Sequence, residues 1–159
     1  MGYNPDINWL KLQIRDVLYY EQPTKYIVEN TTYKNEYKTP VLTAGKTFIL
    51  GYTNEVKGIY NKLPCIIFDD FTTESKFVDF SFKVKSSAMK ILSNNTNVNI
   101  KFIYYLMRQI KVNFDTHKRY WISDFSKKDI IIPSLIIQNK LVKYIESFIK
   151  YFDNIKAEL

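Results

Sequence analysis

The stretch from Ser134 to Leu159 most constrains how this chain folds, because it contains neither glycine nor proline. Ser134 is a good N-cap for a helix that continues to the last residue. Apolar side chains recur along it at alternating steps of four and three, which predicts one continuous helix with a single apolar stripe: Leu141, Ile145, Phe148, Phe152, Ile155 and Leu159.

Such a helix is roughly 40 Å long, which exceeds the width of a small domain. We therefore expect it to project and to bury its stripe against another chain, with the stripe residues forming the contact. The alternative is that the helix folds back onto its own sheet. Leaving its distal phenylalanines and isoleucines in water costs roughly 1.5–3 kcal/mol each, so some partner is expected.

Residues 1–133 are expected to form one globular domain, followed by the spacer and dimerisation helix 134–159. An opening segment at 9–18 is expected to end in an amphipathic turn of helix. A second helix is expected over 100–114, with Asn97 or Asn99 as its N-cap. Residues 129–132 are expected to form a strand. Six short β-type runs lie between turn signals, at 26–28, 40–43, 47–52, 63–68, 76–84 and 89–92. The imperfect alternation within 76–84 predicts a bulge. We expect an α+β fold: a twisted, bulged, mostly antiparallel sheet with flanking helices and a long projecting C-terminal helix that forms a coiled-coil spacer.

Composition excludes several classes of protein. A single cysteine, Cys65, and a single histidine, His117, leave no disulfide framework and no zinc site, and we expect neither a metal nor a cofactor. Apolar runs fall short of a membrane span, and the first residues lack a secretory pattern, so a cytoplasmic protein without a membrane partner is expected.

Positive charge points to a polyanionic partner. The chain has 23 Lys and Arg against 16 Asp and Glu, a net charge of +7. The excess lies in 76–90 and 101–119, whereas the C-terminal helix is nearly balanced. A solvated lysine-rich surface explains such a composition equally well.

Candidate DNA contacts combine these cations with short polar side chains, as duplex recognition requires. The cations expected to position phosphates are Lys46, Lys76, Lys83, Lys85, Lys118 and Arg119. The side chains expected to make polar contacts to the duplex, chiefly at base edges, are Thr47, Tyr52, Asn54, Thr72, Thr73 and Tyr120.

One segment looks enzymatic. Asp70, Glu74 and Lys76 follow the order of a magnesium-dependent nuclease signature. The spacing argues against a nuclease, because Asp70 and Glu74 lie across one turn rather than on neighbouring strands, and a solvated acidic turn is expected instead. Cys65, within an apolar run, is expected to be a buried, inert thiol. The chain alone is therefore expected to be non-catalytic.

Several motifs together resemble a known family. The stretches 40–46, 51–54, 66–72 and 77–92, followed by Ile130–Pro133 and by Gln138–Val142, are similar to the target recognition domain of the specificity (S) subunit of type I restriction–modification enzymes. The spacing from Pro133 to Gln138 matches the family's junction, although the Glu that commonly precedes this Gln is missing. The resemblance implies a non-catalytic subunit that reads double-stranded DNA and docks the methyltransferase (M) and restriction (R) subunits.

Specificity subunits of this family commonly have two recognition domains and two long helices, whereas this chain has one of each. By analogy it is a half-subunit whose helix pairs with that of a second copy, giving a homodimer that reads two separated, symmetry-related half-sites. Two other classes stay open: a magnesium-dependent nuclease, and an interaction module that competes with S subunits and binds no DNA.

Overall fold

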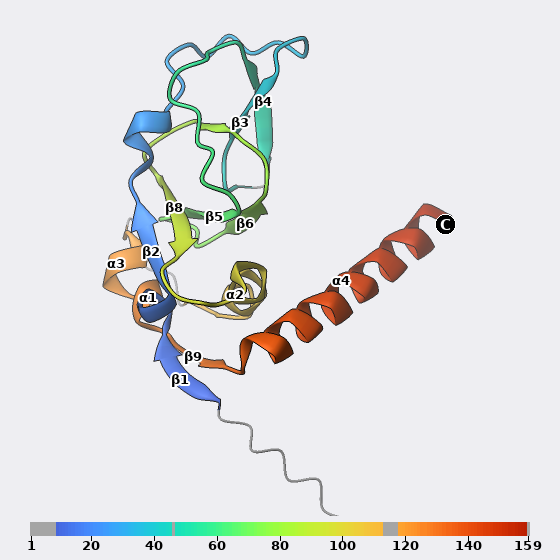
Figure 1. Cartoon of the computed structure of the whole chain (residues 1–159). Coiled ribbons are helices and arrows are strands. Elements are labelled where there is room, and N and C mark those ends of the chain that lie inside the picture. Colours follow the sequence, from blue (N-terminus) through green and yellow to red (C-terminus); the bar gives the residue numbers. More distant parts are fainter. Residues whose placement is uncertain (1–8, 46, 113–117, 159) are drawn as a thin grey trace, which may run out of the picture.

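A four-stranded antiparallel sheet lies between two apolar cores in the computed structural model, which describes residues 9–45, 47–112 and 118–158 (Figure 1). Its strand order is β2–β8–β5–β6, with the bounds Leu18–Glu21, Met89–Asn94, Cys65–Asp69 and Ser75–Val78. Strand β5 is buried on both faces: Ile66 and Phe68 face one core, and Cys65 and Ile67 face the other. This explains why its sequence is a continuous apolar run rather than an alternating one.

Two smaller sheets complete the β structure. In the three-stranded sheet, β3 pairs antiparallel with β4 and parallel with β7, with the bounds Thr39–Leu42, Ile49–Thr53 and Lys83–Val84. In the third sheet, β1 pairs antiparallel with β9, over Leu10–Gln13 and Asp129–Ile132. The expected α+β class and mostly antiparallel pairing are therefore confirmed, with the strands divided among three sheets rather than one.

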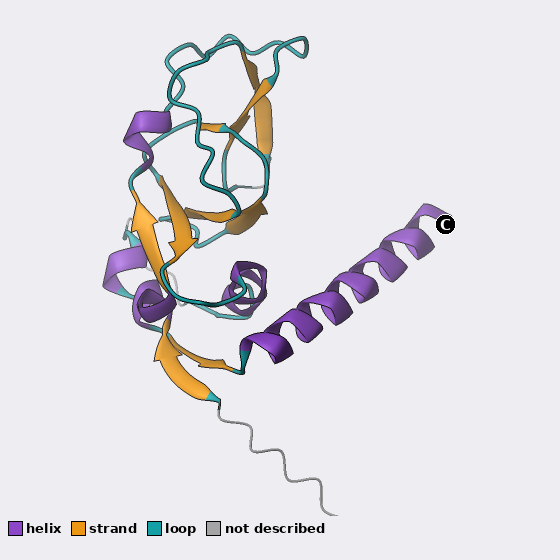
Figure 2. Cartoon of the chain, in the orientation of Figure 1, coloured by secondary structure: helices purple, strands orange, loops and turns teal. Residues whose placement is uncertain are grey.

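Short helices cover one core (Figure 2). Besides strand residues such as Ile66 and Phe68, its buried residues come from α1, α2, α3 and the 3-10 turn η2, over Ile14–Val17, Ile100–Met107, Tyr120–Ser123 and Phe125–Lys127. Phe68 of β5 contacts Trp121 and Phe125 edge-on or tilted, at centroid distances of 5.2 and 4.9 Å. These aromatic contacts fix α3 and η2 beneath the end of the central sheet.

Three predicted elements differ in the structure. The chain leaves the central sheet after Val78, and Phe82 and Val84 then enter the second core. The single strand expected over 76–84 is therefore two strands, β6 and β7. The expected bulge is not within this segment, and the register shift lies at Val41/Leu42 of β3 instead. Residues 23–26 form a 3-10 turn (η1, Pro23–Tyr26) rather than a strand at 26–28. The second helix ends at Met107, and part of its expected extension lies outside the described residues.

The C-terminal helix α4 (Leu135–Glu158) is confirmed, and it projects away from the body (Figure 1). Only Gln138 and Val142 are buried on it. The Gln138 amide accepts from Asn99 N–H at 2.9 Å and donates to Pro133 O at 2.8 Å, while Asn99 also caps α2. The spacing from Pro133 to Gln138 therefore has a physical reason: one buried amide joins the first turn of α4 to the start of α2.

One ion pair holds α4 against the body about two turns further along. Lys101 Nζ of α2 lies 2.6 Å from Glu146 Oε1, and this hydrogen bond raises the pKa of Lys101. Beyond it, every described residue of α4 from Ser147 onward is exposed. No helix in the described part of the chain is long and apolar enough to span a bilayer.

Candidate nucleic-acid interface

Polar side chains expected to contact DNA lie in two groups on different sheets. The first group is at the β3–β4 hairpin, where Thr47 and Asn54 are exposed and Tyr52 is half-buried. Tyr52 lines a shallow groove with Lys38 and Ser81. The hairpin therefore presents hydroxyl and amide groups beside an exposed lysine, a combination suited to a polar, anionic partner.

The second group lies at the turn between β5 and β6. The Asp69 carboxylate accepts from the N–H groups of Phe71 and Thr72, both at 2.9 Å, and Thr73 adopts the left-handed conformation with φ 59°. Phe71 and Thr72 are exposed as a result. The Arg119 guanidinium lies over the Phe71 ring, with Cζ 5.2 Å from the ring centroid. The fold thus brings Arg119 to this turn, against Phe71, from a distant part of the sequence.

Asp70 points inward from the same turn. Its carboxylate is 2% exposed, forms an ion pair with Lys90 at 3.2 Å, and accepts from Trp121 N–H at 2.9 Å. Arg119 Nη1 lies 3.6 Å from the same carboxylate. The expectation of a solvated turn is therefore wrong for Asp70, whose position is interior.

The magnesium-dependent nuclease alternative is not supported. The Asp70 carboxylate already pairs with Lys90 and Arg119 and accepts from Trp121 N–H. Glu74 is exposed on the turn. Among the residues that the structure describes, no three His, Cys, Asp or Glu side chains are placed to hold a metal ion. The expected inert thiol is also found: Cys65 is fully buried, and burial raises its pKa to about 12.

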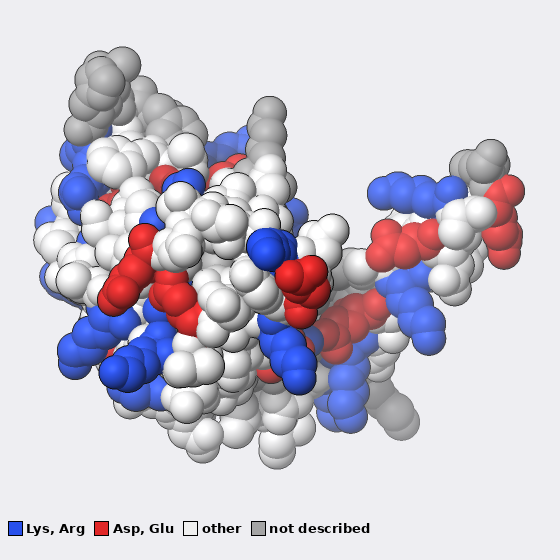
Figure 3. Space-filling model, turned by 90° about the horizontal axis from the view of Figure 1, so that it is seen from above, with Lys and Arg blue, Asp and Glu red and all other residues white. Residues whose placement is uncertain are grey.

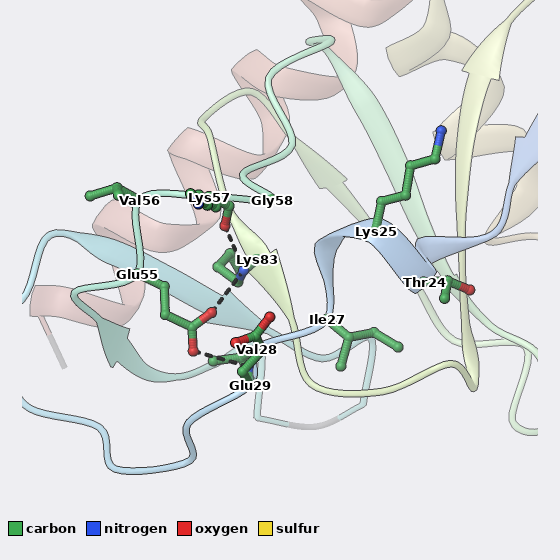
Figure 4. A pocket seen from close by; sticks show the side chains of 10 residues that line it. All are labelled: Thr24, Lys25, Ile27, Val28, Glu29, Glu55, Val56, Lys57, Gly58 and Lys83. Carbon is green, nitrogen blue, oxygen red and sulfur yellow. Dashed lines mark hydrogen bonds and ion pairs between the residues drawn. The ribbon is translucent and has the colours of Figure 1, made fainter.

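Lys83 does not lie where a phosphate contact requires it. It is 3% exposed, its Nζ is 2.8 Å from Glu55 Oε2, and it donates to Lys57 O at 2.7 Å (Figure 4). Tyr120 is likewise 2% exposed. The expectations that Lys83 positions a phosphate and that Tyr120 reaches a base edge need correction, because both side chains are packed inside the domain.

Glu55 ties Lys83 to the preceding loop. Burial alone would raise the pKa of the Glu55 carboxyl, but hydrogen bonds from Asn30 N–H, from Lys83 and from Glu29 N–H outweigh it, so the pKa lies below its ordinary value. Gly58 closes the same site with φ 63°, and a Cβ there would lie 2.4 Å from Lys25 O. The cleft of Figure 4 is therefore a structural ion-pair site.

These positions revise the expected charge distribution. Lys83 and Lys90, two of the four lysines in 76–90, are buried and paired with carboxylates. Of the other two, Lys85 is exposed and Lys76 is half-buried. Figure 3 shows Lys, Arg, Asp and Glu side chains together along α4, which agrees with the balanced charge expected there.

Arg108 and Lys111 are cations that the list of expected contacts leaves out. They line a groove with Thr72 and Thr73, between the β5–β6 turn and the end of α2. Their place in the basic stretch 101–119 is the sequence signal that points to them. Lys46, His117 and Leu159 lie outside the described residues.

The apolar stripe of α4 is largely exposed. Phe148 is 64% exposed, Phe152 57% and Ile155 37%, whereas Leu141 and Ile145 are partly buried near the body. A shallow groove along the stripe is lined by Ile145, Phe148, Ile149, Phe152, Asp153 and Lys156. Two exposed tyrosines outside the stripe, Tyr144 and Tyr151, lie beside Phe148 and enlarge this apolar surface.

Comparison with solved structures shows which class of protein shares this fold. The type I restriction–modification S subunit from M. genitalium matches with a TM-score of 0.72 at 18% identity, over 99% of this chain and 43% of that one. The HsdS subunit from Thermoanaerobacter tengcongensis matches with a TM-score of 0.62 at 12% identity, over 99% and 41%. The fold is thus shared with S subunits of type I systems.

Sequence comparison gives a more specific relationship. The chain is 47% identical to the type I restriction enzyme EcoR124I/EcoR124II specificity subunit of Escherichia coli, over 97% of this chain and 41% of that subunit. No protein-family model matches. The chain is therefore homologous to about two fifths of a type I specificity subunit, and the resemblance expected from its motifs is confirmed.

The Lys83–Glu55 pair makes stability depend on pH. Because the pKa of Glu55 is lower in the folded chain than its ordinary value of 4.5, the ionised carboxylate stabilises the fold at neutral pH, and this contribution fades as pH falls below 4.5. Glu55→Gln is expected to lower the free energy of unfolding by about 3 kcal/mol at neutral pH, since it leaves a buried ammonium unpaired. The difference from wild type should shrink in acid.

Urea denaturation at pH 7 and at pH 4 measures this. The control is Glu36→Gln, whose exposed pair with Lys34 is worth at most about 1 kcal/mol. An equal difference between wild type and Glu55→Gln at both pH values would contradict the role given to Glu55.

Proposed function

We propose that the chain recognises a specific sequence in double-stranded DNA, as half of a type I specificity subunit, and directs M and R subunits to a bipartite site. The observation that carries the proposal is the 47% identity across 97% of the chain to a specificity subunit. The chain spans about two fifths of that relative's length, which accommodates one recognition domain and one spacer helix.

The arrangement of surfaces supports this function. Exposed polar groups and cations lie at the β3–β4 hairpin, at the β5–β6 turn and at Lys85, all on the domain 1–133. The helix of 134–159 bears an apolar stripe instead. DNA recognition and subunit pairing are thereby assigned to separate parts of the chain. Catalysis is left to the partner subunits.

The homodimer is proposed from the stripe on α4. Leaving several large apolar side chains in water costs roughly 1.5–3 kcal/mol each, so an apolar partner surface is expected to cover them. A second copy supplies a matching stripe at the same heptad spacing, and a two-fold axis between the copies places two domains at the ends of a coiled coil.

Selection from a randomised duplex library tests DNA recognition. The purified chain is expected to enrich one motif, and its affinity should fall with salt, because each neutralised phosphate adds about −0.9 to the slope of log affinity against log salt. Lys85→Ala should weaken binding to all sequences alike and make the salt slope shallower by about 0.9. The matched control is Lys140→Ala, an exposed lysine on α4 that should change neither quantity.

A chain that enriches no motif would contradict the proposal. If it then still bound an M subunit, the chain would be an interaction module that competes with S subunits.

Sedimentation velocity tests the pairing of α4. Wild type is expected to sediment as a dimer and Phe148→Asp/Phe152→Asp as a monomer, because the carboxylates would lie in the apolar contact. Lys143→Asp/Lys150→Asp introduces the same two carboxylates on the opposite face and should leave the dimer intact. A monomeric wild type, or a dimer in the Phe148→Asp/Phe152→Asp variant, would exclude pairing through the stripe.

A further inference from the structure

Two side chains on the body contact the Arg119 guanidinium. Its Nη1 lies 3.6 Å from Asp70 Oδ2, and its Cζ lies 5.2 Å from the centroid of the Phe71 ring. The Arg119 side chain is nevertheless 55% exposed, and Phe71 is 41% exposed. An arginine is therefore presented at the surface with a defined orientation.

The support under Arg119 is rigid. Asp70 is 2% exposed and is held by Lys90 of the central sheet and by Trp121 N–H of α3. The backbone of Phe71 is held by the Asp69 carboxylate. The carboxylate thus cannot move far without breaking buried contacts, and the hydrogen bond from Asp69 holds the backbone that carries the ring.

A guanidinium presented in this way can contact the edge of a base. Arginine has five N–H donors in a planar fork, and the contact with Asp70 uses Nη1, which leaves capacity for a bidentate contact. A bidentate contact to O6 and N7 of guanine in the major groove is the commonest specific contact between a protein and DNA. Fixing the fork beforehand reduces the side-chain entropy lost on binding. A phosphate can accept the same fork, but a phosphate beside this site can also be met by the exposed Lys118.

We propose that Arg119 reads a guanine in the major groove, with Phe71 and Asp70 as positioning residues. This inference rests on the proposed DNA recognition, and it replaces the expectation that Arg119 positions a phosphate. Asp70 does not contact the base itself: it sets the direction of the Arg119 fork.

The library selection described above distinguishes the two roles of Arg119. Wild type should prefer guanine at one position of its motif, and Arg119→Ala should lose that preference, which corresponds to a loss of roughly tenfold or more for the guanine-containing duplex. The preferences at other positions and the salt slope should change little. Arg119→Lys should not restore the preference, because an ammonium lacks the planar fork.

The ring contact has its own matched variants. Phe71→Leu keeps an apolar side chain but removes the ring and should weaken the same guanine preference, whereas Phe71→Tyr keeps the ring and should retain it. Because Phe71 lies on an exposed turn, both variants are expected to fold, and thermal denaturation checks this. Lys118→Ala is the control, with an equal loss for all sequences and a slope smaller by about 0.9.

Each alternative outcome is distinct. If Arg119→Ala weakened all sequences equally and reduced the salt slope, Arg119 would bind a phosphate and the inference would be overturned. An unchanged motif and affinity in Arg119→Ala would overturn it as well. If wild type itself selected no motif, the proposed function would fail, rather than the role of Arg119 within it.

Discussion

The buried carboxylate of Asp70 joins three parts of the molecule. It lies just after the last residue of β5 and contacts Lys90 of β8, the backbone of α3 at Trp121, and the exposed Arg119. Removing one partner of such a buried pair costs about 3–5 kcal/mol, because the other charge is left in the interior without compensation. This carboxylate connects the start of the β5–β6 turn to β8 and α3, and it supports Arg119 in the surface proposed to read DNA.

The central sheet explains why the candidate surfaces lie at strand ends. Because β5 is buried on both faces, its side chains are used for packing, and only its ends and loops reach solvent. The helix α4 is attached separately, through the Gln138 amide and the Lys101–Glu146 pair, which both connect it to α2. An attachment at one end and an exposed apolar stripe beyond it are consistent with the proposed pairing of α4.

Local features of the sequence predicted the structure well. The heptad stripe predicted α4, Asn99 caps α2 as one of two candidates, and the strand at 129–132 has the expected bounds. Each depends on residues close together in the chain. The division of the strands among three sheets was not predicted, because it depends on Phe82 and Val84 reaching a core formed largely by distant segments.

Contacts between residues far apart in the sequence also explain why the buried charges were not predicted. Lys83 and Lys90 look like surface cations in a basic segment, but their partners Glu55 and Asp70 are far away in the sequence. Nothing local indicates that these charges cancel inside the protein. Phe71 was passed over for a similar reason, since its stacking partner Arg119 comes from another part of the chain. The number of lysines in 76–90 therefore exaggerates what the β-rich segment offers to DNA.

Mapping DNA methylation in cells that carry this chain with a cognate methyltransferase subunit tests whether two copies of the chain together recognise a symmetric DNA site. We expect a methylated motif that is absent without the chain and that consists of two inverted copies of one half-site separated by a fixed gap. An asymmetric motif would contradict pairing with a second copy. Identical methylation with and without the chain would contradict sequence recognition itself.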